Sequence, residues 1–379
     1  MKVPAVIAGY SRSPYQFARK GALAGTRPDD IAAQVVKGLL ERLDLNPALV
    51  EDVIAGCAYP EGEQGDNVAR IVGFLAGLPN SVAGVTVNRF CGSSMQAVHM
   101  AVGAMQMGAG EAFLCIGLES MTRVPNGGFT PSPNPALMET LPEAYVTMGQ
   151  TAENVARRYE ISRADQEQLA VASHRKADAA QRAGRLDHEI IPIRTADGII
   201  SKDGCIRPGT SAEVLATLKP AFDPEGSVTA GTSSPLTDGA TALLVCTEDF
   251  AQRHKLQATA RIKAAAVAGC PPEIMGMGPV YATRKVLARA GIAMTDIDVI
   301  ELNEAFASQA LACMRELRMD PSRVNIDGGA MALGHPLGAT GARITGKAAD
   351  ILCREGGRYA LATQCIGGGQ GIATLLEAI

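Results

Sequence analysis

Apolar and polar positions follow two different periods along the chain. Short apolar runs, such as Val3–Ala8, Val53–Ala58 and Ala112–Gly117, are typical of buried β-strands. A helical spacing lies between the first two, over Asp30–Leu43, where the apolar positions are Ile31, Val35, Leu39 and Leu43. Strands that alternate with helices indicate βαβ units, so the sequence predicts a largely parallel sheet covered by helices.

One predicted strand-to-helix corner carries a cysteine. The apolar stretch Val82–Val87 predicts a strand that leads to Cys91, and a helix follows at once with Met95, Val98, Val102 and Met105 on one face. Ser93 or Ser94 can cap this helix, and Gly108 can end it. The positive end of the helix dipole favours a thiolate, so Cys91 is a candidate nucleophile with a depressed pKa. The alternative is a small buried hydrophobe, as most free cysteines are.

The pattern is interrupted after residue 122 and then repeats. Prolines and glycines come first, and helices follow, one of them starting at the capping box Ser162-Arg-Ala-Asp165. We interpret 122–227 as an excursion from the sheet, a cap or lid. Beyond it, a predicted strand Val324–Asp327 runs into a glycine-rich turn and a helix over Ala339–Leu352, as Val82–Val87 runs into Cys91. The predicted organisation is one half from 1–121 plus 228–257, an inserted loop domain at 122–227 and a second half at 258–379.

Three further loops at predicted strand ends carry reactive groups. His335 lies in a tight glycine-rich loop at the corner that matches the Cys91 corner, and a cysteine nucleophile needs such a base. Cys365 precedes Gly367, whose N–H group and those of the next two glycines can hold an oxyanion, although a plain glycine turn is the alternative. Asn303 can fix a water or an oxyanion, or simply cap a helix. Two thiols and one imidazole fit carbon–carbon bond formation or cleavage through an enolate.

Composition narrows the class of protein. The 379 residues are 47% hydrophobic and 20% charged, with a net charge of -4, so a nucleic-acid partner has no support. The nine cysteines are odd in number and form no CxxC pair, which predicts reduced thiols and a cytoplasmic location. No group has metal-ligand spacing, and no apolar run approaches the length of a membrane span. The first residues predict a strand, not a signal peptide.

The loops carry four motifs that occur together in one enzyme family. They are Asn88-Arg-Phe-Cys-Gly-Ser-Ser-Met95, Asn303-Glu-Ala-Phe306, Gly328–Gly341 with its Gly-His-Pro, and Cys365-Ile-Gly-Gly-Gly-Gln-Gly371. With these motifs in order, the chain resembles a thiolase from end to end. The resemblance implies an α/β fold of five layers, αβαβα, built from two similar halves, with a loop domain that covers coenzyme A (CoA).

The resemblance also implies roles for particular residues. Cys91 would be the acylated nucleophile, His335 would activate it, and Cys365 would be the acid or base of the second step. His335 and a water held by Asn303 would line one oxyanion hole, and the N–H groups of Cys91 and Gly367 would form the other. Positions that match the CoA or acyl channel are Met148, Arg207, Phe222, Ala230, Ser234, Leu236, Ala305 and Phe306. Arg207 is the natural candidate for the charged end of CoA.

The activity implied is thiolytic cleavage of 3-ketoacyl-CoA to acyl-CoA and acetyl-CoA, reversible as a Claisen condensation, with no permanently bound cofactor. Members that make acetoacetyl-CoA usually carry histidine where this chain has Thr147, so the fatty-acid-degrading branch is favoured and a biosynthetic acetyl-CoA C-acetyltransferase is the alternative. Cys365 argues against a condensing enzyme that uses acyl carrier protein, and the intact Cys91, His335 and Cys365 argue against a non-catalytic member. A homodimer or homotetramer is expected, as is association with a β-oxidation partner subunit.

Overall fold

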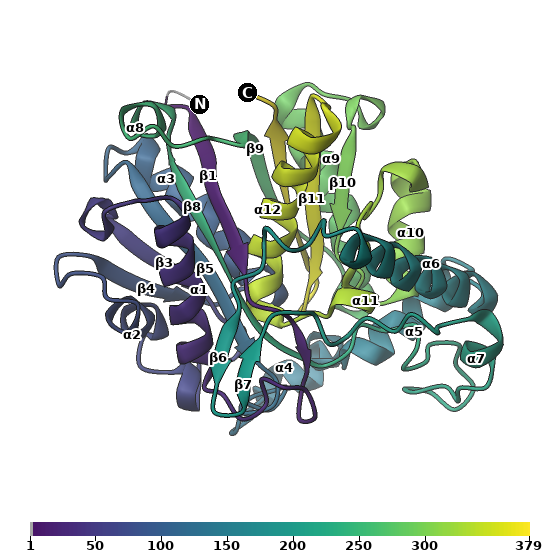
Figure 1. Cartoon of the computed structure of the whole chain (residues 1–379). Coiled ribbons are helices and arrows are strands. Elements are labelled where there is room, and N and C mark those ends of the chain that lie inside the picture. Colours follow the sequence, from purple (N-terminus) through teal and green to yellow (C-terminus); the bar gives the residue numbers. More distant parts are fainter. Residues whose placement is uncertain (1–2) are drawn as a thin grey trace.

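The computed structural model describes residues 3–379. Within them, the strands form one mixed sheet of ten strands and a separate hairpin (Figure 1). The main sheet has the order β10-β11-β12-β9-β1-β8-β5-β3-β4, and β2 pairs with β8 off this path. Its strands are β1 (Ala5–Arg12), β2 (Gln16–Phe17), β3 (Asp52–Gly56), β4 (Ala83–Val87), β5 (Ala112–Ser120), β8 (Thr237–Thr247), β9 (Ala260–Gly269), β10 (Val299–Leu302), β11 (Tyr359–Ile366) and β12 (Gln370–Glu377). The hairpin consists of β6 (Ile193–Thr195) and β7 (Gly198–Ile200).

The main sheet consists of two halves with the same plan. The first half has the order β4-β3-β5-β8-β1, and the second has β10-β11-β12-β9. Val324 forms an isolated parallel bridge with Ile300 of β10, in the place that β4 takes beside β3. The halves join where Val6 and Ile7 of β1 pair with β9. The repeated order is the duplication that the sequence pattern predicts.

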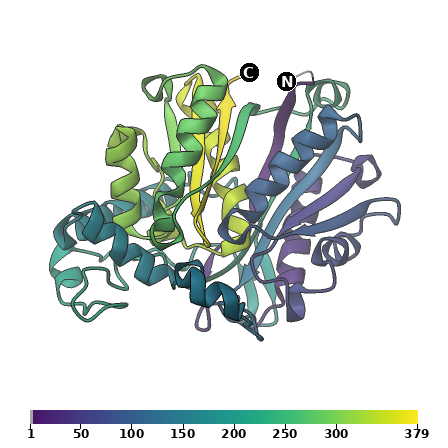
Figure 2. The ribbon, with the colours of Figure 1, turned by 180° about the vertical axis from the view of Figure 1, so that it is seen from behind.

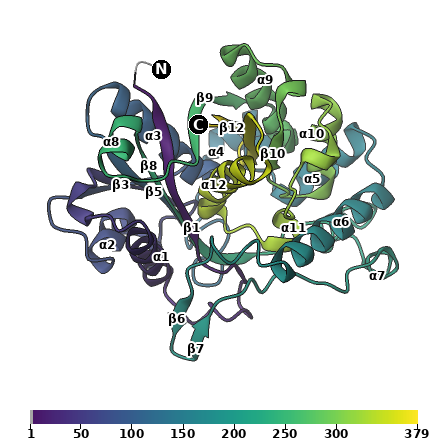
Figure 3. The ribbon, with the colours of Figure 1, turned by 45° about the horizontal axis from the view of Figure 1, so that its top comes forward.

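Helices cover both outer faces and fill the space between the halves (Figures 2 and 3). One apolar core holds α1 (Pro28–Arg42) and α2 (Val68–Leu75) on the first half, and another holds α9 (Gly278–Ala290) and α10 (Ala307–Leu317) on the second. A third core takes residues from both halves and from α3 (Ser93–Gln106) and α12 (Leu337–Glu355), which pack against each other. The two halves of the main sheet are thus two β layers, and the order of layers is αβαβα.

The expectation of a largely parallel sheet is wrong. Only β3 with β4, β3 with β5 and β10 with β11 are parallel among the described strand pairs of the main sheet. β8 runs antiparallel to both β1 and β5, and β12 runs antiparallel to both β9 and β11. Three glycines, Gly367–Gly369, connect β11 to β12, and the last two have φ of 76° and 79°. A connection this short cannot make the crossover that a parallel pair needs.

The predicted strand Val324–Asp327 does not form. Asn325 adopts φ of 48°, outside the extended region, and its side chain replaces the ladder of a strand. Its Oδ1 accepts from the N–H of Leu302 at 2.9 Å and its Nδ2 donates to the carbonyl of Leu302 at 2.9 Å. The end of β10 is therefore satisfied by one amide side chain.

The chain between β5 and β8 leaves the main sheet. It contains the hairpin, the short helices α4 (Pro135–Thr140) and α7 (Ala212–Ala216), and the longer α5 (Met148–Arg158) and α6 (Arg163–Arg182). Ser162 caps α6 as predicted, because its Oγ accepts from the N–H of Asp165 at 3.1 Å. α6 packs through Ala177 and Ala180 on α11 (Ala330–Leu333), beside the second half of the molecule (Figure 1).

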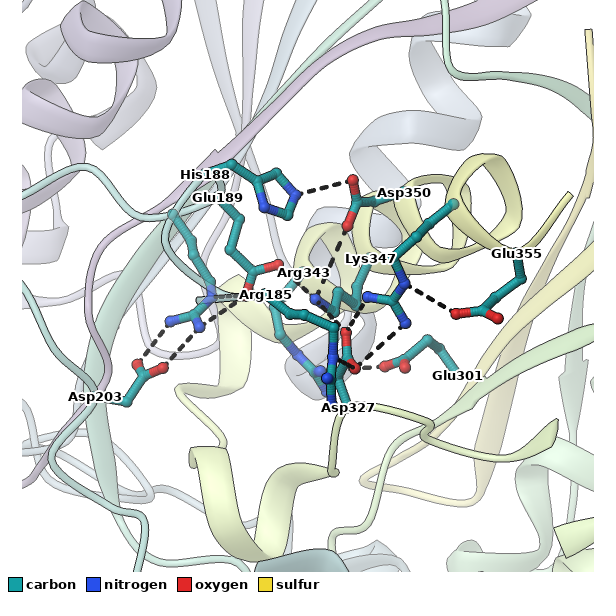
Figure 4. A network of polar contacts seen from close by, with 12 residues as sticks. Arg185, His188, Glu189, Asp203, Glu301, Asp327, Arg343, Lys347, Asp350 and Glu355 are labelled. Carbon is teal, nitrogen blue, oxygen red and sulfur yellow. Dashed lines mark hydrogen bonds and ion pairs between the residues drawn. The ribbon is translucent and has the colours of Figure 1, made fainter. Parts of the chain in front are cut away.

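Buried charges join this segment to β1 and α12 (Figure 4). Arg12 is fully buried and pairs with Asp203 at 2.7 Å and with Glu189 at 2.8 Å. Lys347 on α12 is 1% exposed and lies 3.1 Å from Glu189 and 2.9 Å from Asp327. Burial by itself raises the pKa of Glu189, but the charges of Lys347 and Arg12 outweigh it and lower that pKa to about 2. Each buried positive charge named here therefore lies beside a buried negative charge.

Candidate active site

Cys91 lies in a 3₁₀ turn, Phe90–Gly92, between β4 and α3. Phe90 has φ of 43°, a conformation that costs energy for a residue other than glycine, and Asn88 Oδ1 accepts from its N–H at 2.8 Å. Gln364 Nε2 donates to the carbonyl of Cys91, which ties the turn to β11. These contacts fix the position of the thiol between the two halves.

The predicted serine cap of α3 does not form, since no side chain caps its first turn. Ser93 Oγ accepts from the N–H of Arg89 at 2.9 Å and donates to the carbonyl of Phe90. Ser94 Oγ accepts from the N–H of Ala342 at 2.8 Å and so links α3 to α12. Both serines therefore hold the corner together instead of capping the helix.

Burial, not the helix dipole, determines the protonation state of Cys91. Burial raises the pKa of Cys91 to about 11, and the N–H groups of Gly367 and of Cys91 itself counter it only in part. The predicted depression of this pKa is therefore wrong, and the resting residue is a thiol. Both N–H groups are directed at the Cys91 sulfur.

His335 is 4% exposed and its hydrogen bonds define its tautomer. Its Nδ1 lies 2.6 Å from Thr340 Oγ1, and that hydroxyl donates its own hydrogen to the carbonyl of Pro336 at 3.0 Å. Nδ1 must therefore carry the proton, and Nε2 carries the lone pair and acts as the acceptor of the ring. Burial, with a smaller effect from the charge of Arg343, lowers the pKa of His335 to about 3, so the imidazole is neutral at rest.

Asn303 lies at the end of β10 and faces the imidazole. Its Nδ2 donates to His335 Nε2 at 3.4 Å, and its Oδ1 has no hydrogen-bond partner among the described residues. The next residue, Glu304, is 3% exposed, and its carboxylate accepts from Ser173 Oγ at 2.6 Å and from Asn325 Nδ2 at 2.8 Å. Glu304 therefore anchors the Asn303 loop to α6.

Cys365 lines the same cavity as Cys91 and His335. This cavity has a volume of about 400 Å³, and the segment 122–227 contributes Met148 and Phe222 to its wall. Ser234, Leu236, Ala305 and Phe306 also line it, as the resemblance implies. Four of the predicted site residues, Asn303, Gly367, Arg207 and Ala230, are not among the described residues that line the cavity. Residues that line it without having been predicted are Met121, Asn126, Thr147, Gly149, Ser233, Pro235, Met275 and Leu337.

Arg207 lies outside the cavity, against α6 and β2. Its Nη2 is 3.3 Å from Nε2 of His174, and its guanidinium lies 5.9 Å from the centre of the Phe17 ring. In the part of the chain that the structure describes, no carboxylate forms an ion pair with it. Ala230 is exposed in a turn before β8. The structure therefore does not bring these two residues to the cavity that holds the thiols.

Comparison with known proteins now identifies the family. The model of the thiolase N-terminal domain matches residues 5–249, and that of the thiolase C-terminal domain matches residues 256–378. The chain belongs to the thiolase family. Within this family, the 3-ketoacyl-CoA thiolase of Bacillus subtilis (strain 168) is 43% identical over 386 residues, which is 98% of this chain and 99% of that protein.

Solved thiolase structures have the same fold. The acetyl-CoA acetyltransferase of Bacillus anthracis superimposes with a TM-score of 0.91 at 38% identity and covers 100% of this chain and 99% of its own. The human mitochondrial 3-ketoacyl-CoA thiolase in complex with CoA gives a TM-score of 0.91 at 36% identity, with 100% and 98% covered. Our thiolase therefore shares its complete architecture with both, including the five layers.

The sequence of this thiolase did not predict two residues that support the site. Thr340 orients His335, and Gln364 holds the carbonyl of Cys91. Thr340 lies within the Gly328–Gly341 motif and Gln364 lies directly before Cys365, but a threonine in a helix and a glutamine in a strand give no signal of their own. Across the described residues, no group of His, Cys, Asp or Glu could hold a metal ion, and no helix is long and apolar enough to cross a bilayer.

Proposed function

We propose that this chain catalyses the thiolytic cleavage of 3-ketoacyl-CoA by CoA to acyl-CoA and acetyl-CoA, a step of fatty-acid degradation that is reversible as a Claisen condensation. The observation that carries the proposal is the meeting of two thiols and one neutral imidazole, Cys91, Cys365 and His335, at a single cavity. The naming of the Bacillus subtilis relative as a 3-ketoacyl-CoA thiolase supports the degradative direction.

In the first step, Cys91 attacks the 3-keto carbon while its proton moves to His335 Nε2. Thiol and imidazole are both neutral at rest, because burial raises the pKa of one and lowers that of the other. Proton transfer therefore accompanies the attack and no thiolate exists beforehand. The N–H groups of Cys91 and Gly367 would stabilise one oxyanion, and His335 with a water on Asn303 would stabilise the other.

Cleavage of the bond between the second and third carbons leaves an acyl group on Cys91 and an enolate of acetyl-CoA. Cys365 protonates this enolate and then takes the proton of the incoming CoA thiol, whose sulfur attacks the acyl group on Cys91. The bond between the acyl group and Cys91 breaks, and Cys91 regains its proton from His335 Nε2. Burial raises the pKa of Cys365 well above its usual range, and negative charge on Cys91 raises it further. Cys365 is therefore a thiol at rest and has a proton to give to the enolate.

The segment 122–227 would act as a loop domain that holds CoA over the cavity, between the two halves at 1–121 plus 228–257 and 258–379. Its Met148 and Phe222 lie in the cavity wall, and the Phe222 ring meets the Phe306 ring edge-on at 5.9 Å. CoA is longer than the cavity, so its phosphates would lie outside, where Arg207 has a buried Nε without a hydrogen-bond partner among the described residues. CoA and acyl-CoA are substrates in this scheme, and no permanently bound cofactor is needed.

The decisive test combines mass spectrometry with a substrate panel. Acetyl-CoA should acetylate Cys91 as a thioester and so add about 42 Da to the chain, since the acetyl group replaces the thiol hydrogen and an acyl enzyme is the covalent intermediate of this mechanism. The Cys91→Ser variant should carry no thioester and lose thiolysis, whereas Cys353→Ser, which removes an exposed thiol on α12, should behave as the parent. Absence of any adduct on Cys91 would refute the proposal. Cleavage restricted to acetoacetyl-CoA in the panel would favour the biosynthetic alternative, which the match to an acetyl-CoA acetyltransferase keeps open.

We also propose a homodimer or homotetramer. Among the described residues, β4 pairs with β3 only, so its outer edge is open, and α3 beside it exposes Met100. Open edges are ready to pair with a second copy. Light scattering at micromolar concentration should show a dimer or larger assembly, and a stable monomer would end this proposal.

Association with a β-oxidation partner subunit and a cytoplasmic location are further parts of the proposal. Exposed apolar side chains between residues 129 and 145 support a partner surface; they are Phe129, Leu137, Met138, Leu141 and Tyr145. All nine cysteines are free thiols, which suits a reducing compartment.

A further inference from the structure

Glu119, on β5, is a buried carboxylate that the mechanism above does not use. It is 2% exposed, and hydrogen-bond donors from three parts of the chain surround it. Its Oε2 accepts from the N–H of Ala58 at 2.8 Å and from the N–H of Gly338 at 2.9 Å. Its Oε1 accepts from the N–H of Tyr59 at 3.2 Å and from Gln64 Nε2 at 2.9 Å.

These donors require an ionised carboxylate. A protonated carboxyl would turn one acceptor into a donor and set it against an N–H group. Burial raises the pKa of Glu119, and the N–H groups of Ala58 and Gly338 oppose that rise. Cys57 Sγ also donates to Glu119 Oε1, at 3.7 Å. The described residues therefore offer this carboxylate donors, and no acceptor that a carboxyl proton could bond.

One side of this contact leads to His335. Gly338 lies in the first turn of α12, where the positive end of the helix dipole faces the carboxylate. The same turn carries Thr340, which holds His335 Nδ1 at 2.6 Å. A Cβ on Gly338 would lie 2.6 Å from the carbonyl of Leu118, so the helix end approaches β5 as closely as glycine allows.

The other side leads to Cys91. Ala58 and Tyr59 form the turn after β3, and the Tyr59 ring lies 6.1 Å from the ring of Phe90, which precedes the thiol. Gly56, at the end of β3, touches the backbone of Ser94 in the first turn of α3, because a Cβ there would lie 2.2 Å from its nitrogen. The carboxylate therefore stands between the two helix ends that carry the nucleophile and its base.

We propose that Glu119 is a positioning residue of the proposed thiolase reaction: its ionised carboxylate joins the turn after β3 to the first turn of α12 and so fixes Cys91 and His335 relative to each other. It does not touch the reacting atoms and transfers no proton.

A second effect separates this role from a merely structural one. The negative charge of Glu119 raises the pKa of Cys91, after the larger effect of burial and against the N–H groups of Gly367 and Cys91. The other titratable groups around this thiol are His335 and Cys365, which line the same cavity, and Tyr59, whose pKa the Cys91 charge raises. Removal of the carboxylate charge therefore lowers the pKa of Cys91 while the alignment of thiol and imidazole is lost.

The test measures both effects in two variants of the full chain. In Glu119→Gln, an amide group replaces one acceptor and meets an N–H donor, so we expect kcat for thiolysis to fall by about 10²-fold with little change in KM, as for a small misplacement of a catalytic group. The pH profile of iodoacetamide alkylation of Cys91 should move to lower pH. In Glu119→Asp, the charge remains but the carboxylate is one methylene too short, so kcat should fall while the alkylation profile stays near that of the parent.

Asp298→Asn is the matched control. Asp298 Oδ2 also accepts from two main-chain N–H groups, of Arg358 at 2.7 Å and Tyr359 at 3.1 Å, but at the end of the sheet opposite Cys365. It should leave kcat and the alkylation profile unchanged. A folded Glu119→Gln with parental kcat, or an unmoved alkylation profile, would overturn the proposal, and if this variant does not fold, parental kcat in Glu119→Asp would do so. Alkylation of Cys91 needs no thiolase activity, so failure of the proposed function, seen as an inactive parent, is recognised separately.

Discussion

Replacement of Asp327 by asparagine removes one negative charge from the buried ion-pair network (Figure 4). The side chain of Asp327 is fully buried and lies 2.9 Å from Lys347, 2.7 Å from Arg354 and 2.9 Å from Arg185. Lys347 is itself 1% exposed and keeps Glu189 at 3.1 Å and Asp350 at 3.9 Å as partners in the variant. The variant therefore leaves buried positive charge without full compensation.

The expected loss of stability is about 3–5 kcal/mol, the usual cost of removing one member of a buried ion pair. Unfolding entropy near 60 °C is about 2.1 cal/mol/K per residue, which for a chain of this length is roughly 0.8 kcal/mol/K. A loss of about 4 kcal/mol then lowers the Tm by about 5 °C. Calorimetry or circular dichroism at pH 7 measures this shift directly.

The pH dependence gives a second measure of the same interaction. Burial by itself raises the pKa of Asp327, but the hydrogen bond to Arg354 and the charge of Lys347 outweigh it and hold that pKa well below its usual range. A lowered carboxyl pKa stabilises the fold above the unfolded value of about 3.9, and the contribution disappears as the pH falls toward the folded value. The difference in Tm between parent and variant should therefore be full at pH 7 and shrink below about pH 4.

Two controls isolate the buried charge. Glu111→Gln breaks an exposed pair with Arg253, in which both side chains are about half exposed, and should change the free energy of unfolding by no more than about 0.5 kcal/mol. Asp327→Asn combined with Lys347→Met removes charge of both signs, so its cost should be at least about 1 kcal/mol below the sum of the single costs. A Tm for Asp327→Asn within about 1 °C of the parent, or simple additivity in the double variant, would refute the reasoning.

Three further changes test the proposed active site. Cys365→Ala should still acquire an acetyl group on Cys91 from acetyl-CoA but lose thiolysis and the exchange of acetyl-CoA methyl protons with deuterium; exchange at the parental rate would assign the base elsewhere. Thr340→Val removes the acceptor of the His335 Nδ1 proton and leaves a buried donor unpaired, a cost of about 1–3 kcal/mol, so kcat should fall roughly 10–100-fold in steady-state assays; unchanged kcat would argue against this tautomer. Arg207→Ala should raise KM for CoA by the equivalent of about 1–3 kcal/mol with a smaller effect on kcat, and an unchanged KM would remove Arg207 from the CoA site.

Local pattern was enough to predict most helices, strands and reactive loops. The predicted helix Ala339–Leu352 lies within α12, and the predicted strand Ala112–Gly117 lies within β5. Apolar periodicity depends on which face of an element is buried, and the spacing of apolar residues within that element is enough to show this face. The motifs around Cys91 and Cys365 likewise sufficed to indicate the family, which the domain matches establish.

Strand direction and pairing needed the tertiary structure. An apolar run contains no record of the strand beside it, so the antiparallel course of β8 and β12 could not be read from periodicity. The region of Val324 shows the same limit. Its apolar residues resemble a strand, but the side chain of Asn325 binds both main-chain groups of Leu302 and takes the place of the ladder.

The chemical state of the site is the clearest product of the tertiary structure. The sequence places Cys91 at a helix end, and from the dipole alone a low pKa is expected. Burial between the two halves raises that pKa to about 11 instead, because removal of water penalises a thiolate more than nearby N–H groups stabilise it. The tautomer of His335 likewise depends on Thr340, whose hydroxyl donates its hydrogen to the carbonyl of Pro336. The sequence determined which residues meet the substrate in the proposed site, while the groups that pack around Cys91 and His335 decided their protonation states.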